Sequence, residues 1–409
     1  MTRLEPQGLL YFCASALIFI LLVLQISMNL DLLILYTLIL CLAVWRGRSD
    51  FRIDWAWLTI GLLLAAVIIV ASLLAPNPGY ALFEANRYRD AALFGIAIYL
   101  ACGDELVRYR VYVYCGMLFA FILFAPFTLY EYLKHVQPSF EGSKMVHAPV
   151  TYYWHIRHFN YHGFLAAMLV SLLIVDGRDK NWVLWLLLIF CIGSIVITGG
   201  RAASLSILLF IGLFGWVRSG IRGFILGVSG TLLLMGVLLM IVSLSPAQSV
   251  TQSMIERSNP AAGLNSVSTG RLRIWSLIWE ASATRPAFGF GPGGLKQIGV
   301  DTKFARQPHG IGPQLLIEFG WVGSLIILAC LAELARRVWR QLSAGPVLDG
   351  HSKMLLCAIA AYLFFSMIDG LLFYRLPMHH LAVFLAIIIA LSYKTVSAPN
   401  QHTQNNSLP

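Results

Sequence analysis

The feature that most constrains the fold of this chain is a succession of long apolar runs. A helix needs roughly 20 apolar residues to cross the hydrocarbon core of a membrane. Twelve runs of about that length lie at about 9–27, 30–45, 54–75, 88–102, 111–132, 161–175, 182–198, 202–217, 223–244, 314–335, 354–373 and 378–393. None has the alternating polarity of a membrane β-barrel strand. The runs predict an all-α protein, a bundle of about twelve transmembrane helices.

Composition excludes a water-soluble fold. Hydrophobic residues make up 58% of the chain, charged residues 12%, and the mean hydropathy is +0.76. A soluble domain carries about 25% charged residues, so this chain has too few to cover a surface facing water. We expect one membrane-embedded domain over 1–396 and a polar cytoplasmic tail over 397–409 that has nothing to bury.

The distribution of Lys and Arg predicts the orientation. With the N-terminus in the cytoplasm, fifteen of the 29 basic residues lie on the cytoplasmic side, mostly in short connections, as the positive-inside rule expects. The other fourteen lie outside, mainly in the longer loops 76–90, 133–160 and 245–313, which cross the membrane largely regardless of charge. Both termini are therefore expected in the cytoplasm.

Arginine dominates the outer basic residues, and its planar fork of donors suits phosphate oxygens. The ten are Arg87, Arg89, Arg157, Arg201, Arg257, Arg271, Arg273, Arg285, Arg306 and Arg375. We interpret most of them as anchors beside lipid head groups and expect a minority to bind a phosphorylated substrate. No nucleic-acid partner is expected, because the sequence contains neither a soluble basic domain nor a nucleic-acid-binding motif.

Two of these arginines are expected at helix starts. Arg201 follows the turn TGG at 198–200, and Arg271 begins a helix that Ser268 or Thr269 would cap. A cation there opposes the helix dipole by roughly 0.3–1 kcal/mol, unless an anion is bound by the guanidinium and the helix start together. For each Arg alone, snorkelling into head groups is an equally open interpretation.

His309 lies in the segment RQPHG at 306–310, shortly before an apolar run. A neutral imidazole there can take a proton near pH 7, although a single loop histidine is more often only a polar surface residue. Asp369 lies close to the last outer turn, where a buried acid is expected to pair with an Arg.

The loop 133–160 supplies further candidates. The spacing of His155, His158 and His162 would allow zinc binding, but no carboxylate or Cys completes the set. We therefore predict no metal and no cofactor, and expect Arg157 to face the substrate.

Five short motifs occur in a characteristic order: TGGRAAS at 198–204, GRLRIW at 270–275, FGFGPG at 288–293, Pro308-His309, and QLLIEFG at 314–320. Together they resemble the bacterial O-antigen ligase and polymerase superfamily. Its members are polytopic, metal-independent glycosyltransferases related in architecture to the GT-C class. The resemblance covers roughly 150–325.

This resemblance implies a ligase that moves polysaccharide from undecaprenyl diphosphate to lipid A–core on the periplasmic face of the inner membrane, among membrane lipids. The family's essential arginines correspond to Arg201 and Arg271, and its loop histidine to His309. The family usually has Asn after that His, whereas Gly310 follows here, which leaves open what orients the imidazole. The residues expected to bind substrate are Arg157, Arg273, Arg306, His158, Arg87 and Arg89.

The residue chemistry agrees with this implication. Guanidinium groups can stabilise the charge that grows on a departing lipid diphosphate, and His309 can remove the proton of the attacking hydroxyl, which is typically worth about 10²–10⁴-fold. Attack opposite the diphosphate would invert the anomeric centre. Four alternatives stay open: an O-antigen polymerase, a protein oligosaccharyltransferase, a transporter of a lipid-linked anion, and a structural membrane scaffold.

Overall fold

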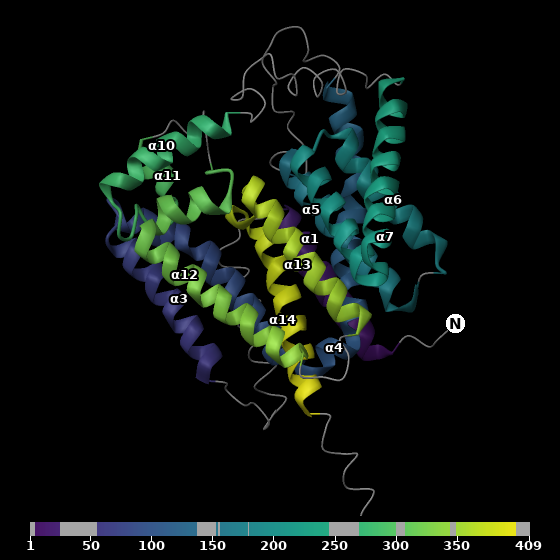
Figure 1. Cartoon of the computed structure of the whole chain (residues 1–409), viewed down its shortest axis with the longest axis horizontal. Helices are drawn as coiled ribbons and strands as arrows, with labels where there is room; N and C mark the ends of the chain where they lie inside the picture. The colour runs from purple at the N-terminus through teal and green to yellow at the C-terminus, as the bar shows by residue number, and fades with distance from the viewer. Residues whose placement is uncertain are drawn as a thin grey trace, which may run out of the picture.

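The computed structural model describes residues 5–24, 55–136, 153, 156–178, 180–244, 270–299, 307–343 and 349–397 (Figure 1). Within these ranges every regular element is a helix, and eight helices are long and apolar enough to cross a membrane. The all-α prediction is confirmed. The predicted span 30–45 and the tail 397–409 lie wholly or almost wholly outside the described residues, so the predicted number of about twelve spans stays a prediction.

The elements follow one another along the chain without a strand in the described residues. They are α1 Pro6–Leu24, α3 Trp55–Leu73, α4 Pro78–Val136, α5 Ile156–Leu173, the π-helical turn η2 Ile174–Arg178, α6 Trp182–Ile197, α7 Arg201–Ser243, α10 Arg271–Thr284, α11 Gly294–Gln297, α12 Ile311–Ser343, α13 Gly350–Ile368, the 3₁₀ turn η4 Leu371–Phe373 and α14 Arg375–Ser397.

Two pairs of predicted spans are joined into single long elements. The runs 202–217 and 223–244 both belong to α7, which breaks at Ser219 and Gly220. Gly220 has φ 63, which favours glycine. A Cβ on Gly215 would come within 2.1 Å of the Gly223 backbone, so the two halves pack as a tight helical hairpin.

Helix α4 contains the other joined pair, and it changes direction between the two runs. In its second half, Arg110 contacts Asp176 just beyond the end of α5, whereas Phe121 stacks on Phe159 near the start of α5. This half therefore runs antiparallel to α5. Figure 1 shows the first half descending beside α3 and the second half rising beside α5, with the change of direction near the α4 label.

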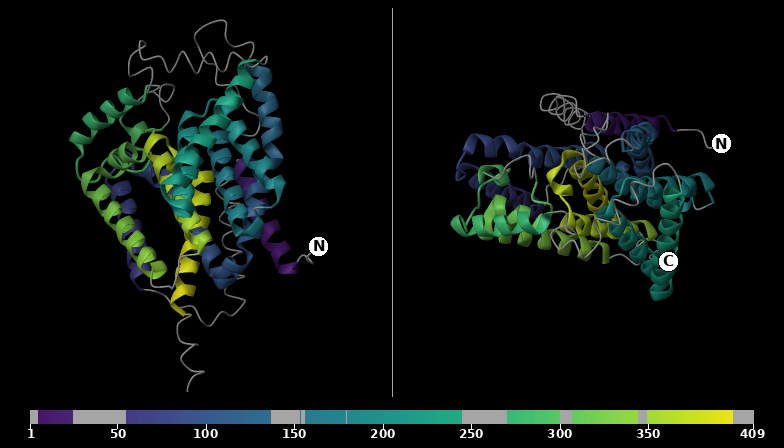
Figure 2. Two further views of the ribbon diagram at one scale, coloured as in Figure 1. Left: turned by 45° about the vertical axis from the view of Figure 1, so that its right-hand side comes forward. Right: turned by 90° about the horizontal axis from the view of Figure 1, so that it is seen from above.

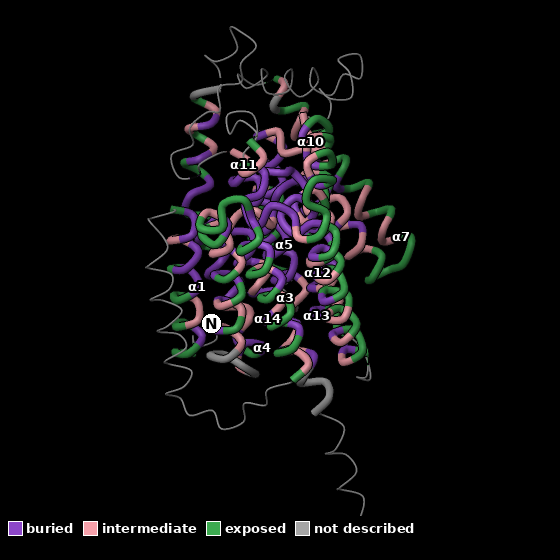
Figure 3. Tube along the Cα trace, turned by 90° about the vertical axis from the view of Figure 1, so that its left-hand side faces the viewer, coloured by how far each residue is buried: buried purple, intermediate pink, exposed green. Residues whose placement is uncertain are grey.

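Helix α5 forms the centre of the larger group of helices. All its residues from His158 to Leu173 are buried, and α4, α6, α7, α13 and α14 contact it. The buried trace in Figure 3 is correspondingly concentrated around α5. Because a transmembrane helix hidden from lipid can carry polar side chains that contact other helices, α5 is suited to hold functional groups.

A smaller group of helices lies to one side of this bundle (Figure 2). It consists of α3 and α12, which pack together, and of α10 and α11, which contact α12. Helix α12 breaks at Gly320, where φ is 63. The segment 286–291 fills the break: Phe290 N donates to Ile317 O (2.8 Å) and Trp321 N to Pro286 O (2.6 Å). The FGFGPG motif thus forms a tight loop.

Polar groups gather at the two opposite ends of α5. Near its end, Asp176 contacts Arg110 at 2.6 Å and His351 at 3.4 Å. At its start, Arg157 contacts His309. This separation is what is expected of groups on opposite sides of a membrane, and the candidate site is at the end where α5 begins.

Candidate functional site

The candidate site is built around His309, which precedes α12. His309 is buried and has φ 53, a left-handed conformation that costs a non-glycine residue of order 1–3 kcal/mol. The indole of Trp275 on α10 donates to Pro308 O at 3.0 Å, and Gln314 N donates to Gly310 O at 3.0 Å at the start of α12. Two helices therefore hold the histidine in a conformation that the chain would otherwise avoid.

Three side chains from distant parts of the chain surround the imidazole. Asp369 Oδ1 and Gln307 Nε2 each lie 3.1 Å from Nδ1 of His309. Arg157 Nη1 lies 3.3 Å from both ring nitrogens, so the guanidinium sits against the ring and favours neither nitrogen. A carboxylate only accepts hydrogen bonds. The contact with Asp369 therefore places the proton on Nδ1 and leaves the lone pair on Nε2. The Gln307 NH₂ group, a donor, would require the opposite tautomer, and the ionised carboxylate is the stronger partner.

Asp369 links the histidine to Arg271. It caps the C-terminus of α13, and its carboxylate accepts from Gly370 N at 2.9 Å and from Arg271 Nη2 at 3.3 Å. The predicted pairing of Asp369 with an Arg is confirmed. Its position in a span was wrong, because α13 ends at Ile368. The sequence left open which group orients the His309 imidazole. In the structure, Asp369 does so through its contact with Nδ1.

The pKa values of this pair follow from burial and charge. Burial lowers the pKa of His309 below its usual value; the hydrogen bond to Asp369 opposes this, and the positive charges of Arg157 and Arg271 add to it. Burial alone would raise the pKa of Asp369, but the hydrogen bond from His309 and the charges of Arg271 and Arg157 outweigh it and hold that pKa well below normal. The site therefore combines a neutral imidazole with an ionised carboxylate near pH 7.

Arg271 is the first residue of α10, as predicted. The residue at the N-cap position is Gly270, with φ 77; Ser268 and Thr269 lie outside the described residues, so a cap by either of them stays a prediction. Arg271 Nε is buried and has no hydrogen-bond partner among the described residues. A buried donor of this kind is costly unless a ligand or water satisfies it.

Arg201 is the first residue of α7, again as predicted. Its position depends on α5, because the Thr198 hydroxyl donates to Asn160 Oδ1. Gly200 packs so closely that a Cβ there would meet Asn160 at 2.8 Å. Asn160 lies one helical turn beyond Arg157, so the same end of α5 contacts both the α6–α7 turn and the His309 ring.

The other predicted residues lie in varied surroundings. Arg273 is exposed, about 200° around α10 from Arg271. His158 is buried against Tyr374, with ring centroids 4.0 Å apart. Arg306 lies outside the described residues. Substrate binding by these residues stays a prediction.

Arg87 and Arg89 lie on the first half of α4 and are both paired within the protein. Arg87 is only 5% exposed and contacts Glu318 and Glu84. Arg89 is half-exposed and pairs with Asp90 at 2.9 Å. The charge of Arg87 is therefore balanced by carboxylates before any substrate arrives, and a substrate-binding role for either residue stays a prediction.

Sequence reasoning missed a polar network around Glu318, a buried acid of α12. Besides Arg87, its carboxylate accepts from the Tyr88 hydroxyl and from Gly293 N at 3.2 Å. Gln314 Nε2 donates to the Tyr88 hydroxyl at 2.9 Å. The network fixes α4 to the beginning of α12, immediately beyond His309. The only signal that could have indicated it was Glu318 itself, an acid near the start of the apolar run 314–335, whose other glutamate, Glu333, lies near its end.

As a whole, the site offers a neutral imidazole beside two guanidinium groups. Arg157 and Arg271 contribute two positive charges and Asp369 one negative charge, so the contacts around His309 leave an excess of positive charge. Such a site can take a proton from a hydroxyl and can stabilise negative charge on a nearby phosphate. Within the described residues, no three His, Cys, Asp or Glu side chains are grouped so as to hold a metal ion.

The protein-family model described as O-antigen ligase matches residues 186–328, from the middle of α6 into α12. The matched segment contains Arg201, Arg271 and His309, whereas Arg157 and Asp369 lie outside it. No curated protein matches the chain. The family supports a membrane glycosyltransferase-like enzyme. The matched segment, with the ordered motifs that it carries, supports a member of the O-antigen ligase/polymerase family.

Proposed function

We propose that this protein is an O-antigen ligase that transfers polysaccharide from undecaprenyl diphosphate to lipid A–core on the periplasmic face of the inner membrane. The observation that carries the proposal is the contact of His309 with Asp369, beside Arg157 and Arg271. The family match and the eight apolar helices support a membrane enzyme acting on lipid-linked glycans.

The arginines bind the donor diphosphate in this proposal. Arg271 keeps a buried, unsatisfied Nε next to its contact with Asp369, as far as the described residues extend, and guanidinium groups bind phosphate oxygens by charge-assisted hydrogen bonds. Arg201, at the start of α7, adds a second cation and the positive end of a helix dipole. Their charges stabilise the negative charge that grows on the leaving diphosphate, without a metal ion.

His309 acts as the general base. The acceptor hydroxyl oxygen attacks the anomeric carbon of the donor while the bond from that carbon to the diphosphate oxygen breaks. The hydroxyl proton passes to Nε2 of His309, and undecaprenyl diphosphate leaves with the bonding electrons. Attack from the opposite side inverts the anomeric centre. Asp369, which is hydrogen-bonded to Nδ1, stabilises the imidazolium that forms.

Transfer assays on purified variants test the proposal. We expect Arg201→Ala, Arg271→Ala and His309→Ala each to lower turnover by at least about 10²-fold, because each removes a group that acts on developing charge. Arg108→Ala is the matched control. This exposed arginine pairs with Glu5 at the end of the molecule away from the candidate site. Near-normal turnover by all three site variants would contradict the mechanism.

The identity of the acceptor separates the ligase from its relatives. The same donor is offered with lipid A–core, with a second lipid-linked chain, or with an acceptor protein. A ligase elongates only the first, a polymerase the second and a protein oligosaccharyltransferase the third. A transporter would move labelled donor across a vesicle membrane and form no glycosidic bond.

A further inference from the structure

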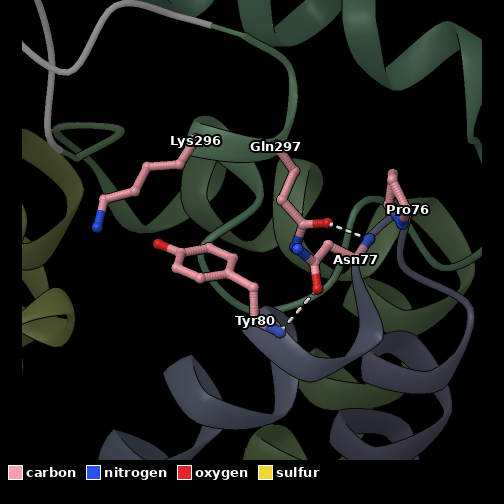
Figure 4. A pocket seen from close by; sticks show the side chains of 5 residues that line it. All are labelled: Pro76, Asn77, Tyr80, Lys296 and Gln297. Carbon is pink, nitrogen blue, oxygen red and sulfur yellow. Dashed lines mark hydrogen bonds between the residues drawn. The ribbon is translucent and has the colours of Figure 1, made fainter.

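A pocket lies apart from the His309 cluster, between the start of α4 and α11. Its volume is about 300 Å³, at the lower end of the range for ligand sites. The lining residues are Pro76, Asn77, Tyr80, Lys296 and Gln297. Figure 4 shows Gln297 reaching from α11 toward Asn77, while Lys296 extends past the hydroxyl end of Tyr80, away from Asn77 and Pro76. None of these residues is used by the mechanism above.

The lining combines one aromatic ring with several hydrogen-bonding groups. Gln297 Oε1 accepts from Asn77 N at 3.0 Å, which holds the amide in place and leaves its nitrogen on the side of Tyr80 (Figure 4). Gln297 Nε2 is buried and has no hydrogen-bond partner among the described residues. The Lys296 ammonium lies 5.4 Å from the centre of the Tyr80 ring and is 40% exposed. An unsatisfied amide donor and an ammonium group beside an aromatic ring suit a polyhydroxylated ligand.

The charges near the pocket favour an uncharged ligand. Lys296 Nζ lies 3.5 Å from Glu84, and Glu84 also contacts Arg87, which pairs with Glu318. Two cations and two carboxylates therefore balance one another. A phosphate would compete with Glu84 for Lys296, whereas neutral hydroxyl groups can accept from Lys296 and from Gln297 without disturbing these pairs.

The same network connects the pocket with the candidate active site. The Tyr80 hydroxyl donates to Glu84 at 2.7 Å. Tyr88, two helical turns further along α4 and about 12 Å away, receives a hydrogen bond from Gln314 just beyond His309. A glycan of several sugars could span this separation. Contacts at the remote end of a substrate add to its binding energy.

We infer that the pocket between α4 and α11 is a subsite for an uncharged sugar of a glycan substrate. This inference rests on the proposed glycan transfer, since it assigns the pocket to the same reaction. The sugar belongs either to the donor polysaccharide or to the acceptor core, and both present the same hydroxyl chemistry. Tyr80 offers its ring, while Lys296 and Gln297 donate to the hydroxyl groups.

Protection of Lys296 from acetylation tests the subsite without requiring catalysis. The purified full-length protein is treated with an amine-acetylating reagent, and modification of each lysine is followed by mass spectrometry. The probes are the lipid-free O-antigen saccharide and the delipidated core oligosaccharide of the strain that carries this chain. A probe at twice its dissociation constant should slow acetylation of Lys296 about threefold. Acetylation of Lys180, exposed between η2 and α6, serves as the control and should not change.

The outcomes separate the possibilities. Protection by the O-antigen saccharide alone assigns the pocket to the donor, and protection by the core oligosaccharide alone assigns it to the acceptor. Absence of protection by both probes, or equal slowing at Lys180, would overturn the subsite. The His309→Ala variant should keep the protection while losing transfer; if it keeps transfer, the role of His309 as base fails. If the unmodified protein transfers no glycan, the proposed function fails, and the protection result still decides the pocket.

A kinetic measurement adds an independent check. Lys296→Met removes one hydrogen-bond donor far from the reacting atoms, so we expect KM for the protecting substrate to rise about three- to tenfold with kcat nearly unchanged. Lys180→Met is the matched control. An unchanged KM for both substrates, or a fall confined to kcat, would contradict a binding role for Lys296.

Discussion

At the scale of single residues, the pairing of His309 with Asp369 makes a prediction about pH. The neutral imidazole is the form that accepts a proton, so activity should fall as pH decreases through the His309 pKa, which burial holds below its usual value of about 6.5. Asp369 favours the protonated imidazole. Asp369→Asn should therefore shift the acidic limb of kcat/KM to lower pH and lower kcat by about 10²-fold.

The control for this variant lies on the same helix. Asp349 caps the N-terminus of α13 by accepting from Ser352 N at 2.7 Å. Asn caps helices about as well as Asp, so Asp349→Asn should leave the pH profile unchanged. An acidic limb that stays in place or moves to higher pH in Asp369→Asn would contradict the assigned role of Asp369.

Gly310 makes a second prediction at this scale, because the structure leaves no room for a side chain there. A Cβ on Gly310 would lie 2.9 Å from Met367 O and 3.4 Å from the Trp275 ring, and φ is 154. Gly310→Asn, which adds a side chain at this position, should destabilise the fold by about 1–3 kcal/mol. The measurement is the thermal unfolding midpoint of the purified protein.

A neighbouring glycine provides the comparison. A Cβ on Gly312 would meet no described atom within 4 Å, and Gly312 lies inside α12, so Gly312→Ala should be neutral or stabilising by up to about 1 kcal/mol. Equal unfolding temperatures of Gly310→Asn and Gly312→Ala would show that the close packing of Gly310 against Met367 does not restrict the residue at position 310.

Residue types and motif order were sufficient to select Arg201, Arg271 and His309 from the sequence. The partners of His309 were not predictable in the same way. Asp369 follows it by 60 positions and Arg157 precedes it by 152, and only the packing of α13 and α5 brings them together. Arg87 was selected from the sequence as a substrate-binding residue, but its charge is neutralised by Glu318. That pairing depends on a contact between α4 and α12 that residue type does not reveal.

At the scale of elements, the break in α12 explains the glycine-rich motif before it. The break frees backbone groups on both sides of Gly320. The segment 286–291 pairs with them, since Gly291 N donates to Glu318 O at 2.9 Å and Val322 N to Ala287 O at 3.1 Å. In the low-dielectric interior of a membrane, leaving such groups unpaired would cost several kcal/mol each.

This pairing predicts a large effect of Gly320→Ala. A Cβ there would lie 2.6 Å from Pro286 O, Ala287 O and Gly289 N, at a φ of 63. The loop would have to leave the break, so we expect unfolding to be easier by about 3 kcal/mol or more. Chemical denaturation in detergent measures the change, and Gly236→Ala in α7, where a Cβ would meet no described atom within 4 Å, is the control. Equal stability of the two variants would contradict the role of the break.

The types of element were predictable because apolar runs of sufficient length have few alternatives to a helix in lipid. Their connections were less so. The turn at Ser219–Gly220 is so short that two predicted spans join in α7. In α4, the residues between the runs 88–102 and 111–132 remain helical, although they include the charged pair Asp104 and Glu105. Hydropathy detects the apolar runs and gives no information about the direction of the chain between them.

At the scale of the whole molecule, charged groups occupy both ends of the central helix α5. One end has the cluster of Arg110, Asp176 and His351, and the other has Arg157 with His309 and Asp369. The middle of α5 between these clusters is buried and apolar. A charge at the centre of a membrane is costly, so we expect the two clusters to lie near opposite membrane surfaces. Locating one cluster on its side of the membrane therefore locates the other.

Labelling with a membrane-impermeant thiol reagent locates the sides. In intact cells carrying a cysteine-free variant of the protein, Lys296→Cys in α11 should react from outside, because α11 belongs to the predicted outer loop 245–313. Lys180→Cys, just beyond the π-helical turn that follows α5, should react only after the inner membrane is opened, because it lies at the end with Arg110 and Asp176. The reverse pattern would place the His309 cluster in the cytoplasm, away from a periplasmic acceptor. Labelling of both positions from outside would mean that the two ends of α5 do not lie on opposite sides of the membrane.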